Sequence, residues 1–169
     1  MMPPARARFR LHVVTEPERL YFGHMTVYPD GHKERLHGHN ARIFVDLDLA
    51  DGAMARMVDL DQIRLPLGAL CDAWRERLLL PAKNPFLEIV RDDGDELEFR
   101  LCGARYVCPR GDVVLLPIEN CSVEGLAEHV AHHLRDAMAA AVAEGNVLGF
   151  EVRVEELPGI GASHYLALA

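Results

Sequence analysis

The segment RLHGHNARIFVDLDL, residues 35–49, constrains the fold of this chain more than any other stretch. From residue 37 onward, two histidines and then apolar side chains alternate with glycine, asparagine, arginine, phenylalanine and aspartate. Side chains two residues apart point to the same face of a β-strand. The alternation therefore predicts a strand over residues 37–50 with one face made by His37, His39, Ala41, Ile43, Val45, Leu47 and Leu49.

Several other segments have the composition and alternation of strands, bounded by turn residues. They cover residues 7–14, 19–27, 86–91, 95–101, 105–116 and 147–157. The first two are predicted either as separate strands or as one strand interrupted around Pro17. Asp92-Asp93-Gly94 is a typical hairpin turn between the third and fourth segments.

Two segments have helical spacing. Residues 59–79 carry apolar side chains three and four apart, and Asp59 or Asp61 is suited to cap the start. A second helix is predicted to begin near Ser122 and to end at Gly145-Asn146. Strands, helix, hairpin, helix and strand in that order predict an α+β fold with an antiparallel sheet.

Length and charge limit the classes of function. The 169 residues fit a single domain over residues 1–169, and the formal charge of −8 argues against non-specific nucleic-acid binding. No apolar run is long enough to span a membrane, and we read the N-terminus as untargeted, so a cytoplasmic protein is expected. Four cysteines without a CxxC pair predict reduced thiols.

The histidine pair predicts a metal site. On one strand, His37 and His39 project side by side and can take adjacent positions on one ion. The segment YFGHMT places His24 in another predicted strand, which makes it the best third ligand. Three histidines around zinc with an open fourth position are typical of catalytic zinc. The glycine between the paired histidines allows another chain or a ligand to approach closely.

These motifs together resemble a known family. YFGH, LHGHN, the alternating strand, MVDLDQI at a helix start, IENCSVEGLAEHV and VRVEELPGIGASHY occur in the order found in the 6-pyruvoyl-tetrahydropterin synthase and 6-carboxytetrahydropterin synthase family. The resemblance implies the tunnelling fold, in which two helices cover one face of an antiparallel sheet. It also implies that His24, His37 and His39 bind zinc, that Glu156 holds the pterin, and that Glu124 is a second pterin contact or only a helix-start acid.

The sequence departs from the usual family pattern in three ways. The cysteine that usually precedes HGH is absent, and Glu34 stands where the ExxHGH variant has a glutamate, which suits a general base. The usual Asp-His dyad aligns with Glu76 and Arg77, and arginine cannot act as a base at neutral pH. An insertion at about residues 82–116, with a predicted β-hairpin, either covers the site or extends an oligomer contact.

The resemblance therefore implies a zinc-dependent lyase that acts on 7,8-dihydroneopterin triphosphate. Its product would be a pyruvoyl-, carboxy- or hydroxymethylpterin, for tetrahydrobiopterin, queuosine or folate synthesis, and its assembly a homohexamer of two trimers. Candidate cations for the triphosphate are Lys33, Arg35, Arg42 and Arg77. Two alternatives remain open: a pterin- or purine-binding protein without turnover, and a metal-dependent oxygenase.

Overall fold

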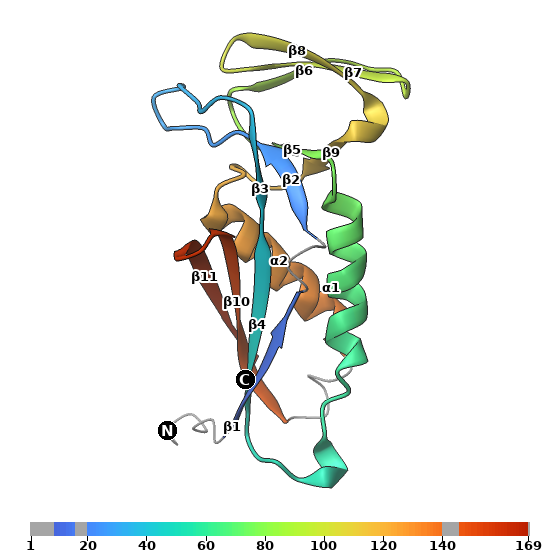
Figure 1. Cartoon of the computed structure of the whole chain (residues 1–169), viewed down its shortest axis with the longest axis vertical. Coiled ribbons are helices and arrows are strands. Elements are labelled where there is room, and N and C mark those ends of the chain that lie inside the picture. Colours follow the sequence, from blue (N-terminus) through green and yellow to red (C-terminus); the bar gives the residue numbers. More distant parts are fainter. Residues whose placement is uncertain (1–8, 16–19, 140–145, 169) are drawn as a thin grey trace.

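A computed structural model describes residues 9–15, 20–139 and 146–168 of the chain. One four-stranded sheet is antiparallel and has the order β1 (Phe9–Val14), β4 (Arg42–Leu49), β10 (Val147–Leu157) and β11 (Ile160–Ala167). Helix α2 (Val123–Ala137) lies across β10 and β11, and α1 (Asp61–Trp74) packs beside α2 (Figure 1). The predicted α+β fold, with an antiparallel sheet and two helices on one face, is confirmed.

The main core lies between this sheet and the helices. Ile43, Val45 and Leu47 alternate along β4 toward the helices and are fully buried, as their period of two predicts. On α2, Leu126 and Val130 form part of the facing apolar stripe and are buried as well. Burial of these side chains supplies the main driving force for folding and fixes the face of β4 that continues toward the histidines.

Helix α2 begins as the sequence predicts. The Ser122 hydroxyl accepts a hydrogen bond from the backbone N–H of Gly125 at 3.4 Å, which satisfies one of the free donors of the first turn. At the other end, α2 closes at Ala137, with Met138 as its C-cap. The predicted stop at Gly145 lies outside the described residues.

A second four-stranded sheet carries the histidines. Its order is β3 (His37–Asn40), β2 (Tyr21–His24), β5 (Leu78–Pro81) and β9 (Val113–Leu116). β2 and β3 are antiparallel, whereas the β2–β5 and β5–β9 pairs are parallel. The strand predicted over residues 37–50 divides at Ala41, whose N–H donates to the carbonyl of Leu20 at 2.8 Å, so that β3 and β4 join different sheets.

Helix α1 is shorter than the predicted span of 59–79. It ends at Trp74, and Glu76 follows in the left-handed region with φ 62°. Residues 78–81 then form β5, whose four side chains are all buried. The N-cap of α1 is Leu60, without a side-chain hydrogen bond, while Asp59 accepts from the N–H of Asp61 at 3.0 Å.

The insertion forms a sheet of its own. β6 (Leu87–Asp92), β7 (Glu96–Leu101) and β8 (Ala104–Pro109) make an antiparallel meander at the end of the molecule opposite β1 (Figure 1). Leu97, Phe99 and Leu101 pack with β5 and the segment after β2 in a second hydrophobic cluster. The insertion is therefore anchored to the histidine-bearing sheet.

The described residues also form two short 3-10 turns, Met54–Arg56 before α1 and Arg110–Asp112 before β9. The second turn divides the strand predicted over residues 105–116 into β8 and β9, so that prediction of one strand was wrong. Cys102, Cys108 and Cys121 are free thiols. Within the described part of the chain, no helix has the length and apolar character needed to cross a membrane.

Candidate metal centre and pocket

Three histidines converge where β2 and β3 pair. In this antiparallel register His24 lies opposite His37, and His39 falls on the same face two residues further along β3. The ring centroids are 4.7 Å apart for His24 and His37, 5.2 Å for His24 and His39, and 4.8 Å for His37 and His39. Each ring offers one nitrogen that lies within 4.8 Å of the other two, so one ion can reach all three.

The glycine of the HGH motif permits this close pairing. A Cβ at Gly38 would lie 3.1 Å from the carbonyl oxygen of Phe22 on β2, which is tighter than ordinary van der Waals contact. Gly38 also pairs directly with Gly23, so that neither strand carries a side chain at this position of the opposite face. Gly38 thus allows strand β2 of the same chain to approach closely.

Backbone carbonyls orient two of the imidazoles. Nδ1 of His24 lies 2.7 Å from the carbonyl oxygen of Cys121, and Nδ1 of His37 lies 2.8 Å from that of Arg35. Because a carbonyl only accepts, each Nδ1–H donates, and the Nε2 lone pair of the neutral ring is left to face the cluster. Metal-binding histidines usually donate their other ring N–H to such an acceptor.

His24 has the properties of a ligand before any ion binds. Its side chain is 1% exposed, and burial lowers its pKa despite the hydrogen bond to Cys121 and the nearby Glu156 carboxylate, which raise it. His24 Nε2 and one oxygen of Glu156 are buried without a hydrogen-bond partner among the described residues. An unsatisfied buried nitrogen is costly, and a metal ion would satisfy it. The residues present therefore fit a metal ion, and three imidazoles favour zinc.

Two carboxylates flank the cluster. Glu156 places its oxygens 3.4 Å from Nε2 of His24 and 3.8 Å from Nε2 of His39, at a bulge near the end of β10. Glu155 instead forms an ion pair with Arg153 at 2.6 Å. The structure thus distinguishes the two neighbours, and only Glu156 of the pair contacts the imidazoles.

Glu34 approaches from the loop before β3. One of its oxygens lies 3.9 Å from Nε2 of His37, and the other accepts from the Tyr28 hydroxyl at 3.4 Å. Burial alone would raise the pKa of Glu34, but hydrogen bonds from Thr26 and the nearby imidazoles outweigh it and hold the pKa below its ordinary value. The carboxylate is therefore ionised at neutral pH.

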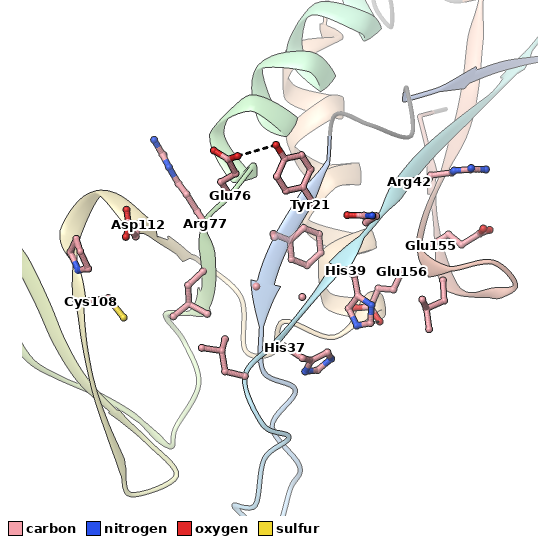
Figure 2. Close-up of a pocket in the computed structure, with 18 of the residues that line it drawn as sticks. Tyr21, His37, His39, Arg42, Glu76, Arg77, Cys108, Asp112, Glu155 and Glu156 are labelled. Atoms are coloured by element: carbon pink, nitrogen blue, oxygen red, sulfur yellow. Dashed lines mark hydrogen bonds and ion pairs between the residues drawn. The ribbon is translucent and has the colours of Figure 1, made fainter.

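A pocket of about 1160 Å³ opens beside the cluster. Figure 2 shows His37, His39 and Glu156 on one side, and Tyr21, Glu76 and Arg77 across from them. Val107, Cys108, Pro109 and Asp112 add a wall from the insertion and the turn after it. The insertion therefore contributes side chains to the wall of the pocket.

Not every predicted residue reaches the pocket. Glu124 is exposed in the first turn of α2 and is not among the lining residues. Arg42 and Arg77 line the pocket. Lys33 instead lies over the ring of Tyr106, and Arg35 is exposed outside the lining.

The segment that aligns with the family's dyad also lies in the pocket wall. The Tyr21 hydroxyl donates to Glu76 at 3.0 Å, and the Arg77 guanidinium donates to the carbonyl of Ala73 at 3.2 Å. Among the described lining residues, the histidines are those of the HGH motif alone. In the described part of the chain, no imidazole outside this motif lines the pocket in place of the family's usual histidine.

Sequence reasoning missed several lining residues. Tyr21 and Asn40 belong to the motifs YFGH and LHGHN on β2 and β3, and their nearness to His24 and His39 is a signal that could have been used. Cys108 and Asp112 come from a segment about 70 residues further along the chain than the HGH motif, and nothing in the sequence links the two.

The chain is similar in sequence to known proteins of one family. The model of the family "6-pyruvoyl tetrahydropterin synthase" matches residues 13–166. A protein of Methanocaldococcus jannaschii, provisionally described as a 6-carboxy-5,6,7,8-tetrahydropterin synthase, is 28% identical over 132 residues, which make up 76% of this chain and 78% of the relative.

Solved structures share the fold. The 6-pyruvoyl tetrahydropterin synthase of Plasmodium vivax matches with a TM-score of 0.81 at 20% identity, covering 94% of this chain and 99% of the other. A variant of that enzyme, described as a mutant in which cysteine replaces a catalytic glutamate, gives a TM-score of 0.83 at 20% identity, covering 94% and 98%. The Plasmodium falciparum enzyme gives 0.79 at 20% identity, with the same coverage of 94% and 98%.

The family model covers nearly the whole chain, and the related structures reproduce its helices and sheets. Of the motifs that suggested this resemblance, YFGH, LHGHN and VRVEELPG contribute residues to the pocket. The chain therefore has the tunnelling fold and belongs to the 6-pyruvoyl tetrahydropterin synthase family, whose members act in pterin biosynthesis.

Proposed function

We propose that this protein is a zinc-dependent lyase that acts on 7,8-dihydroneopterin triphosphate. The observation that carries the proposal is that His24, His37 and His39 each direct one ring nitrogen toward a common point at the edge of a large pocket. Zinc held there would act as a Lewis acid toward hydroxyl groups of the substrate side chain and make neighbouring protons easier to remove.

Glu34 is the proposed base. It is ionised and lies beside His37. It also precedes the HGH motif, in the segment where most family members have a cysteine and this chain has none. The description of a glutamate as catalytic in the Plasmodium vivax enzyme supports a carboxylate in this role. Positioned general bases contribute about 10²- to 10⁴-fold to rate.

Glu156 and two arginines are proposed to position the substrate. A carboxylate can accept two hydrogen bonds in one plane from the pterin ring N–H and amino groups, which suits the carboxylate of Glu156 in the pocket wall. Arg42 and Arg77 offer cations for the triphosphate. Glu124 would contact a pterin only if the ligand extends beyond the pocket of one chain, as in the homohexamer of two trimers that we also propose.

Incubation of zinc-loaded protein with 7,8-dihydroneopterin triphosphate tests this function. Chromatography and mass spectrometry of the products would show a pyruvoyl-, carboxy- or hydroxymethylpterin. The Glu34 position favours 6-hydroxymethyl-7,8-dihydropterin, because that product is expected of the ExxHGH pattern. If the fully zinc-loaded protein converts no substrate, the lyase proposal is refuted.

A second candidate function has its own support. Arg77 occupies the position of the family's usual histidine and cannot take up a proton, and Glu76 beside it is already hydrogen-bonded to Tyr21. A pterin-binding protein without turnover would keep the pocket and need no relay. Micromolar binding of the triphosphate without product would favour this candidate, and size measurement in solution would test the hexamer.

A further inference from the structure

A second cluster of metal-ligating side chains lies on the helix layer, built from elements that the first centre does not use. Glu128 and His132 are on α2, and His164 is on β11. Each offers one ligand atom, and these atoms lie within 4.8 Å of one another. The cluster combines two imidazoles with one carboxylate.

Secondary structure brings the three side chains together. Glu128 and His132 are four residues apart, which places them one above the other on the same face of the helix. On β11, Ala162, His164 and Leu166 are partly buried while Gly161, Ser163 and Tyr165 between them are exposed. His164 pairs with the fully buried Val152 of β10, so it points toward the helix layer.

The packing of α2 on β11 closes the cluster. Helix α2 lies across β10 and β11 (Figure 1), and the rings of His132 and His164 have centroids 5.7 Å apart. Nε2 of His132 lies 3.9 Å from a Glu128 oxygen, which is too long for a hydrogen bond. Within the described part of the chain, neither ring has a hydrogen-bond partner, so both keep nitrogens free for an ion.

We propose that Glu128, His132 and His164 form a second site for a divalent transition-metal ion. Two histidines and one carboxylate on one side of an ion leave its other positions to water, a ligand set that suits zinc, cobalt, nickel or iron. The His132 and Glu128 side chains are 42% and 59% exposed, so the ion enters from solvent without any rearrangement of the core. Bound metal would tie the edge strand β11 to α2.

Zinc titration of a protein without the first centre tests the site. In the His37→Ala, His39→Ala double variant, calorimetry with Zn²⁺ alone should still show one equivalent bound per chain. Adding His132→Ala and His164→Ala should remove that equivalent, and Glu128→Gln should weaken it by about tenfold or more. In the otherwise unchanged chain, His132→Ala should lower the zinc count by one and leave the basal turnover unchanged.

His133→Ala is the matched control, because this exposed histidine is the next residue on the same helix and is not in the cluster. It should leave the zinc count unchanged. Circular dichroism of each variant separates loss of the site from loss of the fold. The proposal would be overturned if the His37→Ala, His39→Ala variant bound no zinc. It would also be overturned if zinc remained bound after His132 and His164 were replaced, or if His133→Ala removed the zinc.

Discussion

Replacement of Glu34 by glutamine tests the assignment of the base. The substitution keeps the size of the side chain and removes its negative charge and its ability to accept a proton. Glu34 lies 3.9 Å from Nε2 of His37, and a catalytic hydrogen bond of this kind often tightens only when substrate is bound. We expect Glu34→Gln to lower kcat by about 10²- to 10⁴-fold, equivalent to about 2.7–5.4 kcal/mol of transition-state stabilisation.

The same variant should keep its metal. His37 is oriented by the carbonyl of Arg35, and His24 by that of Cys121, so neither ring depends on Glu34 for its tautomer. Loss of an orienting partner costs about 10- to 100-fold in metal affinity, and Glu34 is not such a partner. Zinc content, measured by plasma mass spectrometry, should therefore equal that of the unchanged protein.

Single-turnover kinetics with the triphosphate substrate provide the rate, and Glu155→Gln provides the control. Glu155 lines the same pocket but is already paired with Arg153, so its replacement should change kcat by less than about tenfold, well below the effect of losing the base. A Glu34→Gln variant that turns over at the normal rate with full zinc would refute the assignment. Loss of zinc together with activity would show that Glu34 acts as a ligand instead.

Three further perturbations follow from the geometry. His39→Ala should abolish stoichiometric zinc binding at the first centre, measured by calorimetry, whereas His32→Ala, at an exposed ring stacked on Tyr28, should not. Gly38→Ala should destabilise the fold by about 1–3 kcal/mol in chemical denaturation, because its Cβ would crowd the facing strand; an unchanged midpoint would contradict the close pairing. Burial, aided by two neighbouring histidines, lowers the pKa of His129 in the folded protein. As the pH falls, the unfolded chain therefore takes up a proton at this residue before the folded chain does. The stability that is present above about pH 6.5 is lost as the pH falls through the folded pKa. His129→Gln should therefore reduce the fall in Tm between pH 7.5 and 5.5, and an unaltered fall would refute this.

Local patterns in the sequence predicted most of the elements. β10 spans residues 147–157 as predicted, and Ser122 caps α2, because each depends on a short repeat or on one side chain next to its own backbone. The histidine triad was predicted for the same reason: period two places His37 and His39 together, and His24 has a strand context of its own. The resemblance to a family then implied the same three residues as zinc ligands.

The missed features depend on contacts between distant parts of the chain. The division of β3 from β4 at Ala41 follows from pairing with the segment before β2, and no break in alternation marks it. Leu78 and Leu79 of β5 were assigned to the end of a helix, because LLLP is buried on both faces between parallel strands and has no period of two. β11 was not separated from the end of β10, although Gly159, with φ 82°, marks the turn between them.

The same reasoning explains what the sequence left open at the site. The carbonyls of Cys121 and Arg35 have no side-chain signature, so the orientation of the rings could not be predicted. The wall of the pocket formed near Cys108 depends on how the inserted sheet packs on Leu80 and its neighbours. Short motifs predicted the candidate ligands and the candidate base, and tertiary packing decides what surrounds them.

The central claim is that His24, His37 and His39 share one zinc ion with a position open to substrate. Anomalous diffraction at the zinc edge from crystals of zinc-loaded protein measures this directly. We predict a peak bonded to Nε2 of all three rings at about 2.0–2.1 Å, with no fourth side chain completing the shell. A peak that lacks any one of these rings, or no peak between β2 and β3 at full zinc loading, would contradict the account.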